Sequence, residues 1–317
     1  GDEIITTPRT YIATSSSAVL QGLKPIFADV DRNSGCITDK TIEPLINKNT
    51  KAITVVHIGG WPAEMNKICD LAKTYNLKII EDCAQSPGAK INGKNAGTFG
   101  DVSAWSFCQD KIISTCGEGG MVTTSDENIW RNIWSFKDHG KSYEKMHEKN
   151  SSPSFKWVHN SFGTNFRMTE IQAAIGRNQL KRFNDWHLIR KRNAEYFIKE
   201  LSDLNLLRIP FVPSNIEHAW YKFTVYLNSN ALASDWSREK ILSAIRDEGY
   251  PAFSGSCSEI YLEKCFIDNN IYPKNPLPIA RELGETSLTF LIHPTISMDQ
   301  LQKYGSVIKE IVLKASR

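Results

Sequence analysis

An acid, a hydroxyl and a lysine follow two strands that the first half of the chain predicts. The mostly apolar run 77–80 leads to Asp82, and the run 102–107 contains Ser106 and is followed closely by Lys111. Short apolar runs bounded by turn signals indicate buried strands of an α/β sheet. Ligands of such sheets bind outside the carboxyl ends of the strands. We therefore expect Asp82, Ser106 and Lys111 to lie at one rim of the sheet.

These three residue types suit pyridoxal 5'-phosphate. Its pyridine nitrogen needs a carboxylate partner to stay protonated, and its aldehyde needs a lysine for a Schiff base. Its phosphate needs hydroxyl and backbone N–H donors. Asp82, Lys111 and Ser106 could fill these roles in that order. Each also has an ordinary explanation, because an Asp after a strand often caps a turn, a loop lysine is usually solvated, and a serine is usually a cap.

The elements that must position these residues alternate along the chain. Strands are expected at 1–7, 24–30, 52–56 and 77–82, and helices at 11–21, 38–46 and 64–75. This repetition predicts an α/β fold with a mostly parallel, doubly wound sheet. The loop 117–120 (GEGG) precedes a strand rather than a helix, which argues against a dinucleotide-binding fingerprint.

The second half of the chain changes character. Helices are predicted at 127–136 and 168–201, with a long polar loop at 137–163 between them. Beyond residue 201, strands at 207–212, 219–227 and 287–292 alternate with helices at 237–248 and at the C-terminal end, where Ser297 and Gln300 form a capping box. We therefore expect a large domain at 1–201 and a smaller α+β domain at 202–317.

Composition limits the class of protein. Hydrophobic residues make up 41% and charged residues 23% of the 317 residues, which is typical of a soluble globular protein. A net charge of +3 is too mild to indicate nucleic acid. No apolar run approaches the ~20 residues of a membrane span, and nothing resembles a signal peptide. The seven cysteines are scattered without C-x-x-C spacing, which favours reduced thiols in the cytoplasm over disulfides or a metal site.

Several longer motifs occur in a characteristic order. They are GDEIITTPRTYIAT, EDCAQSPGA, GTFGDVSAWSF with a following DK, CGEGGMVTT and GTNFRMTEIQAAIGRNQL. The chain resembles the DegT/StrS family of PLP-dependent nucleotide-sugar aminotransferases, a branch of fold-type I, closely over 1–196 and more loosely beyond. In that family the opening motif follows several dozen residues that include a Gly-Thr loop and helix at the cofactor phosphate. We expect that part of the phosphate site to lie outside the present sequence.

The resemblance implies roles for individual residues. Lys111, in SFCQDK, matches the lysine that forms the Schiff base and moves the proton, and Asp82 matches the partner of the pyridinium. Ser106 matches a phosphate contact. Gln85 matches a residue that hydrogen-bonds the ring hydroxyl, and Tyr11 matches an aromatic residue that stacks on the ring. The alternatives are a surface amide for Gln85 and a core aromatic for Tyr11.

Other matched positions concern the substrate and a second subunit. Asn165 matches a residue that in relatives reaches the cofactor phosphate of the neighbouring subunit, which implies a homodimer with a shared active site; its alternative is a helix N-cap ahead of Met168. Weaker candidates for sugar or amino-donor contacts are His57, Glu118, His218 and His293, each of which could instead be structural. Candidates to meet a nucleotide diphosphate by charge are Lys137, His139, Arg190 and Arg192, and the alternative for the two arginines is a solvated helix face.

The resemblance implies a PLP-dependent aminotransferase with ping-pong kinetics. An amino acid, expected to be glutamate, would convert the cofactor to pyridoxamine phosphate, which would aminate a nucleotide-linked keto-sugar for polysaccharide or antibiotic biosynthesis. One alternative is a pyridoxamine-dependent sugar dehydratase, whose relatives carry histidine at the position of Lys111. The other is a non-catalytic or regulatory member. The acid Asp110 beside Lys111 departs from the common pattern and would favour a charged lysine unless it points away.

Overall fold

The central element is a six-stranded sheet, seen in a computed structural model that describes residues 1–149 and 154–317. Its strand order is β2-β1-β3-β4-β7-β8, and every neighbouring pair is parallel except β7 and β8. The strands are β1 (Glu3–Thr6), β2 (Lys24–Phe27), β3 (Thr50–Val56), β4 (Lys78–Asp82), β7 (Val102–Ser106) and β8 (Gly120–Thr123). The predicted mostly parallel α/β sheet is confirmed.

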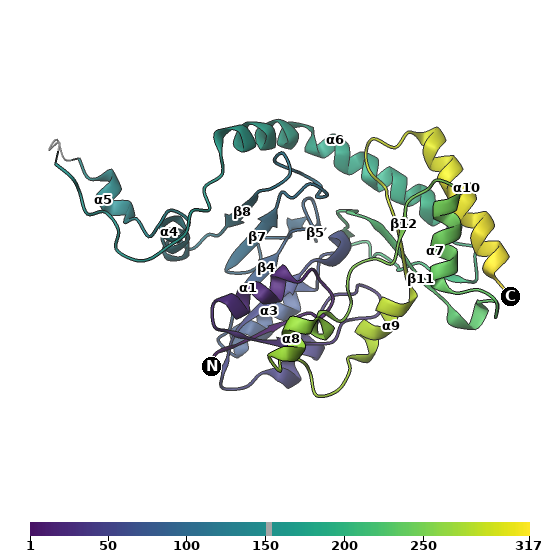
Figure 1. Ribbon diagram of the computed structural model, residues 1–317, viewed down its shortest axis with the longest axis horizontal. Helices are drawn as coiled ribbons and strands as arrows, with labels where there is room; N and C mark the ends of the chain where they lie inside the picture. Colours follow the sequence, from purple (N-terminus) through teal and green to yellow (C-terminus); the bar gives the residue numbers. More distant parts are fainter. Residues whose placement is uncertain (150–153) are drawn as a thin grey trace.

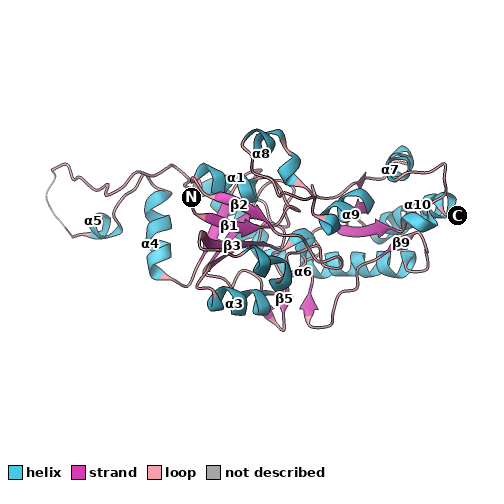
Figure 2. Cartoon of the chain, turned by 90° about the horizontal axis from the view of Figure 1, so that it is seen from below, coloured by secondary structure: helices cyan, strands magenta, loops and turns pink. Residues whose placement is uncertain are grey.

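Helices and a small edge sheet surround this sheet (Figures 1 and 2). The connecting elements are α1 (Ala13–Leu20), α2 (Asp39–Ile42), the 3-10 turns η1 (Glu43–Leu45) and η2 (Ile58–Gly60), α3 (Met65–Thr74) and α4 (Glu127–Phe136). The edge sheet joins β5 (Lys90–Ile91), β6 (Lys94–Asn95) and β10 (Ile216–Glu217). Thr38 caps α2 as predicted, and the fully buried Ile5, Ile53 and Met65 belong to the core that α3 helps to close.

A 32-residue helix, α6 (Glu170–Leu201), runs from the first sheet to a second core (Figure 1). The second sheet has the order β12-β13-β11-β9, with β9 (Leu207–Arg208), β11 (Phe223–Leu227), β12 (Ala252–Phe253) and β13 (Ser287–Phe290). It packs with the end of α6 and with α7 (Arg238–Asp247) and α10 (Met298–Ala315), while η3 (Ser229–Ala231) follows β11. The fully buried Phe197, Phe223, Phe290 and Ile308 form the centre of this core. The capping box of Ser297 and Gln300 starts α10, as predicted.

The segment 254–286 returns to the first core. It contains η4 (Ile260–Leu262), α8 (Lys264–Asp268) and α9 (Pro278–Thr286). Ala280 and Leu283 of α9 pack among first-core residues, and Phe27 of β2 contacts the rings of Tyr261 and Phe266. The division at residue 201 stays a prediction, because the first core also contains residues from beyond it, namely Tyr226 of β11 and Ala280 and Leu283 of α9.

An arm extends from the body between α4 and α6 (Figure 1). It carries α5 (Tyr143–His147), capped by the side chain of Ser142, so the prediction of an uninterrupted loop at 137–163 was wrong. Residues 150–153 of that prediction lie outside the described residues. Large aromatic side chains are solvent-exposed along the arm, at Phe155, Trp157, Phe162 and Phe166.

Two predicted strands are shorter than expected. The run 207–212 pairs only at β9, since Pro210 has no N–H to donate. The run 219–227 pairs only from Phe223, because Trp220 has φ 52° and leaves extended geometry. All seven cysteines are free, and within the described residues no helix combines the length and apolarity that a bilayer span needs.

Candidate active site

Asp82 ends β4 and is held by two groups, one from the first helix and one from its own loop. Its Oδ2 accepts a hydrogen bond from the Thr14 hydroxyl at 2.8 Å, and the Thr14 and Thr10 hydroxyls are themselves 2.8 Å apart. The backbone N–H of Ala84 donates to Asp82 Oδ1 at 3.1 Å. The carboxylate is thus fixed in direction at the carboxyl end of its strand.

Ser106 and Lys111 belong to the next strand and its loop. Asp82 lies opposite Ala104 in the β4–β7 pairing, so Ser106 ends β7 at the same rim. A cavity of about 420 Å³ is lined by Asp82, Ser106, Thr14 and Ala84 among others, which is within the range of small-molecule sites. Lys111 does not line this cavity within the described residues; it leaves the same rim on the loop after β7, with its side chain 14% exposed.

Lys111 lies in a cluster of charged and aromatic groups. Its Nζ is 3.8 Å from Asp110 Oδ1 and 5.1 Å from the ring centre of Tyr221. Asp110 Oδ2 accepts a hydrogen bond from the Tyr221 hydroxyl and lies 3.5 Å from Lys222 Nζ. Burial alone raises the pKa of Asp110, but the Tyr221 hydrogen bond and the Lys111 and Lys222 charges outweigh it and lower the pKa overall. Burial, and then the hydrogen bond to Asp110, raises the pKa of Tyr221.

The structure excludes the alternative interpretations of Gln85 and Tyr11. Gln85 is buried, and its Oε1 accepts a hydrogen bond from Gly59 N at 2.7 Å, so it is not a surface amide. Tyr11 is 70% exposed just before α1, so it is not a core aromatic. Their roles at a cofactor ring stay predictions.

His57 is not available to a substrate, so its prediction as a sugar or donor contact was wrong. It is fully buried, its Nδ1 accepts from Ala63 N, and its Nε2 donates to Glu81 Oε2 at 3.0 Å. Three backbone N–H groups in the loop 97–100 also donate to Glu81. Burial raises the pKa of Glu81, but these donors and His57 lower it overall. The thiol of Cys83 completes a possible metal-ligand triad, yet the Glu81 oxygens are already occupied by these donors.

The other weak candidates have separate environments. His218 is buried against the rings of Trp61 and Trp220, burial lowers its pKa to about 3, and its Nδ1 accepts from Trp220 N. Glu118 is exposed, with Oε1 3.9 Å from the Cys108 sulfur. His293 is exposed and paired with the Thr295 hydroxyl, and partial burial lowers its pKa.

The four charged residues predicted to contact a nucleotide diphosphate also lie in different environments. For Arg190, the alternative of a solvated position on a helix face is wrong. Its side chain is 3% exposed and donates hydrogen bonds to the backbone carbonyls of Trp220 and Tyr221. Burial lowers its pKa to about 10. Arg192 is exposed and bonded to Asn193. Lys137 lies over the Trp134 ring, and His139 is exposed with φ 59°.

Asn165 lies at the base of the arm, where it forms an isolated antiparallel β-bridge with Asp138. It does not line the cavity that contains Asp82. The alternative that it caps the long helix is wrong, because Thr169 is the N-cap and forms a capping box with Gln172.

Three residues that contact the candidate site residues were missed from the sequence. Thr14 belongs to the TYIAT motif, and its i, i+4 spacing from Thr10 could have suggested a hydroxyl pair at the start of α1. Tyr221 and Lys222 have no such local signal, because they lie more than a hundred residues from Lys111.

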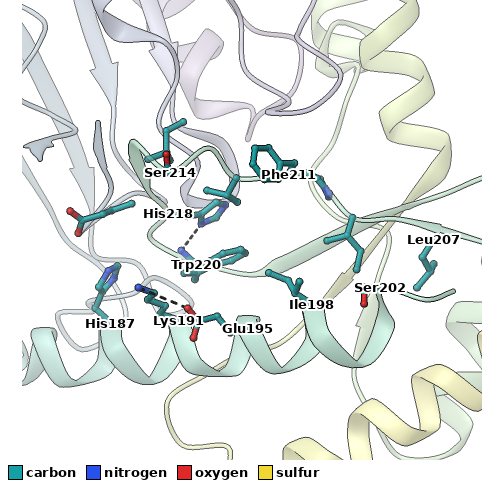
Figure 3. A pocket seen from close by; sticks show the side chains of 15 residues that line it. His187, Lys191, Glu195, Ile198, Ser202, Leu207, Phe211, Ser214, His218 and Trp220 are labelled. Carbon is teal, nitrogen blue, oxygen red and sulfur yellow. Dashed lines mark hydrogen bonds and ion pairs between the residues drawn. The ribbon is translucent and has the colours of Figure 1, made fainter. Parts of the chain in front are cut away.

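A larger cavity of about 650 Å³ lies between α6 and the segment 207–220 (Figure 3). Its lining carries both signs of charge, from Lys191 on one hand and Glu195 and Glu217 on the other, while burial lowers the pKa of His187 and favours its neutral form. His218 and Trp220 form its stacked inner wall in Figure 3.

Known proteins are similar to this chain in sequence and in fold. The profile of the DegT/DnrJ/EryC1/StrS aminotransferase family matches residues 1–310. The chain is 33% identical to a UDP-N-acetyl-3-dehydro-alpha-D-glucosamine 3-aminotransferase from Acidithiobacillus ferrooxidans, over 98% of this chain and 77% of that protein. An aminotransferase structure from Psychrobacter cryohalolentis is 47% identical with a TM-score of 0.97, covering 99% of this chain and 82% of that one.

A third relative is a GDP-4-keto-6-deoxy-D-mannose-3-dehydratase from E. coli, solved with bound hydrated PLP. It is 26% identical with a TM-score of 0.85, and the match covers 97% of this chain and 80% of that one. The present chain therefore belongs to the DegT/DnrJ/EryC1/StrS aminotransferase family, a family of pyridoxal-phosphate-dependent enzymes whose members include sugar aminotransferases.

Proposed function

We propose that this protein is a PLP-dependent aminotransferase that moves an amino group from glutamate to a nucleotide-linked keto-sugar. The observation that carries the proposal is the carboxylate of Asp82, held by Thr14 and Ala84 on the rim from which the loop with Lys111 leaves. The cavity at Asp82 and Ser106 is of a size for the cofactor. The UDP-sugar aminotransferase among the relatives supports the substrate class.

The cofactor would supply an electron sink for the carbanion that forms at the donor Cα. Asp82 would keep the pyridine nitrogen protonated by offering it a negative charge. The Ser106 hydroxyl would donate to the phosphate. Lys111 Nζ would accept the proton from the donor Cα and return a proton during transfer to the sugar.

The lysine also favours transamination over dehydration. The dehydratases of the resembling family carry histidine at this position, and Lys111 is present here. An amine can hold the cofactor covalently and act as the base in both half-reactions.

An absorption spectrum of the purified full-length protein tests the chemistry. We expect added pyridoxal phosphate to give the near-ultraviolet to visible band of lysine-bound cofactor, and L-glutamate to bleach it. Lys111→Ala should lack the band, whereas Lys51→Ala, which changes an exposed lysine of β3, should retain it. A wild-type protein that binds the cofactor without this band would contradict the proposal.

We further propose a homodimer in which Asn165 contributes to the partner's cofactor phosphate. Two features support it: Asn165 lies at the base of the arm, and the arm presents Phe155, Trp157 and Phe162 to solvent, at 77%, 79% and 100% exposure. A cluster of exposed aromatic side chains of this kind is typical of an interaction surface.

Mixed dimers of two inactive variants test the shared site. If Asn165 acts across the interface, Asn165→Ala mixed with Lys111→Ala produces dimers with one intact site. Random mixing should then restore roughly a quarter of wild-type activity, because half of the dimers are mixed and half of their sites are intact. No restoration in verified mixed dimers would show that Asn165 acts within its own subunit.

The protein would act in the cytoplasm on small molecules. The free state of all seven cysteines supports a reducing compartment, and the net charge of +3 gives no reason to expect nucleic acid as a partner. The nucleotide sugar and the amino acid are therefore the expected ligands.

A further inference from the structure

A small cavity next to the Lys111 cluster is lined by two cations and no carboxylate. Its volume is about 60 Å³, and Arg9 and Lys222 are the charged side chains in its wall. Trp61 and Phe223 contribute apolar surface, and Thr224 adds a hydroxyl group to the lining. The space is about that of two water molecules, which suits a carboxylate and excludes a sugar.

Arg9 is a buried guanidinium without a carboxylate partner. It is 3% exposed, its Nη1 donates to the Tyr226 hydroxyl at 2.7 Å, and its Nε has no hydrogen-bond partner. No acidic side chain of the described residues forms an ion pair with it. A buried charge without a counter-ion is costly, so a bound anion would satisfy it.

The guanidinium is also held in place. It packs 5.4 Å from the centre of the Tyr226 ring, and a Cβ at Gly35 would come within 2.7 Å of Arg9 Nη1. The side chain therefore has little freedom to swing toward solvent. A fixed, planar donor group is suited to a carboxylate, which it can bind through two parallel hydrogen bonds.

Lys222 links the cavity to the reacting lysine. Its Nζ lies 3.5 Å from Asp110 Oδ2, and Lys111 Nζ lies 3.8 Å from the other oxygen of that carboxylate. Lys111 and Lys222 thus face one acid, and Lys222 also lines the cavity together with Arg9. Gly59 also lines the cavity, and its N–H donates to Gln85, which is predicted to meet the cofactor ring.

We infer that this cavity binds a carboxylate of the amino donor, with Arg9 as the main contact and Lys222 as the second cation. The inference rests on the proposed function and identifies the donor as an acid-bearing molecule held beside Lys111. The larger neighbouring cavity of Figure 3 is a poorer anion site, because Glu195 and Glu217 offset the charge of Lys191.

Binding of succinate, an unreactive dicarboxylate, tests the site without turnover. Calorimetric titration into the cofactor-saturated full-length protein should show binding in the wild type and a Kd higher by roughly 30-fold or more in Arg9→Gln, the usual effect of removing one partner of a buried charge pair. Lys222→Gln should weaken binding less. Arg32→Gln is the matched control, because Arg32 is exposed and paired with Glu282, and its Kd should equal that of the wild type.

The glutamate half-reaction gives a second measurement. Arg9→Gln should raise the glutamate concentration needed for half-maximal bleaching by a similar factor, while its affinity for pyridoxal phosphate stays within about threefold of wild type. Unchanged succinate and glutamate binding in a folded Arg9→Gln protein would overturn the inference. If that variant does not fold, Lys222→Gln decides: a smaller rise of the succinate Kd is expected, and an unchanged Kd in the folded variant would overturn the inference.

The two proposals fail in different ways. If the wild type shows no reaction with glutamate but binds succinate through Arg9, the carboxylate site stands and the aminotransferase proposal fails. If glutamate bleaches the wild type and Arg9→Gln equally, the aminotransferase stands and the carboxylate site is refuted.

Discussion

Replacing Glu81 with glutamine should destabilise the fold more than almost any other single change of similar size. The carboxylate is fully buried next to Asp82. Its Oε2 accepts from His57 Nε2 at 3.0 Å and from Gly97 N at 2.7 Å, and its Oε1 accepts from Phe99 N and Gly100 N at 2.7 Å each. It therefore connects the ends of β3 and β4 with the loop 97–100.

The magnitude follows from this geometry. Glutamine keeps one oxygen and replaces the other with an NH₂ group, which must point at two N–H donors in either orientation. Two charge-assisted hydrogen bonds are lost, each worth about 1.5–3 kcal/mol, so the free energy of unfolding should fall by about 3–6 kcal/mol. The free energy of unfolding of a typical domain is only about 5–15 kcal/mol, so this loss would be a large part of it.

Chemical denaturation of Glu81→Gln and wild type at neutral pH measures the loss. The control is Glu217→Gln, because Glu217 is half exposed in its pair with Lys90 and should change stability by less than about 1 kcal/mol. A loss below about 1 kcal/mol in Glu81→Gln would refute the assigned bonding. The difference should also depend on pH. The folded-state pKa of Glu81 lies below its ordinary 4.5, so its stabilisation is present above about pH 4.5 and is lost as the pH falls through the folded value.

Three further predictions concern the site, the second core and the thiols. Thr14→Val removes the 2.8 Å hydrogen bond to Asp82 and should weaken pyridoxal phosphate binding by about 10-fold or more, while Thr14→Ser should not; equal affinities in a spectroscopic titration would contradict the positioning role. Phe197→Ala empties a fully buried position of the second core and should lower the free energy of unfolding by about 3–5 kcal/mol in denaturant titrations, and a loss under 1 kcal/mol would show that this core is not tightly packed. Burial raises the pKa of the Cys36 thiol to about 12, whereas Cys116 is exposed, so iodoacetamide at pH 8 should label Cys116 in the native protein and Cys36 only after unfolding; similar native rates would contradict the packing around Cys36.

Local patterns in the sequence predicted the scaffold well. The bounds of α4 at 127–136 and the caps of α2 and α10 follow from residues within a few positions of one another. The rim position of Asp82 follows from the same logic, because an apolar run and the acid that ends it are adjacent in the chain. Features of this kind depend on short-range hydrogen bonds and side-chain periodicity, which a single sequence displays directly.

Long-range pairing was beyond the reach of such patterns. His57 was a weak candidate for a substrate contact, but nothing in the sequence shows that its Nε2–H is donated to Glu81 of the next strand. Arg190 lies on a helix whose sequence pattern is amphipathic, but its guanidinium donates to the carbonyls of Trp220 and Tyr221. The turn that presents these carbonyls depends on the positive φ of Trp220. In both cases the partner is set by tertiary packing, so a side chain that looks free in the sequence is already occupied in the fold.

The acid beside Lys111 need not oppose the proposed catalysis. Asp110 was expected to favour a charged Lys111 unless it pointed away, and it does not point away completely, since 3.8 Å separates the two groups. However, the same carboxylate accepts a hydrogen bond from Tyr221 and lies closer to Lys222, at 3.5 Å. Its negative charge is therefore shared, and Lys222 takes the closer ion pair. If a donor carboxylate enters the cavity of Arg9 and Lys222, it will compete with Asp110 for Lys222, and Asp110 will then interact more strongly with Lys111. Asp110→Asn should thus change the glutamate half-reaction more than cofactor binding, whereas an effect on cofactor binding alone would place Asp110 outside the donor site.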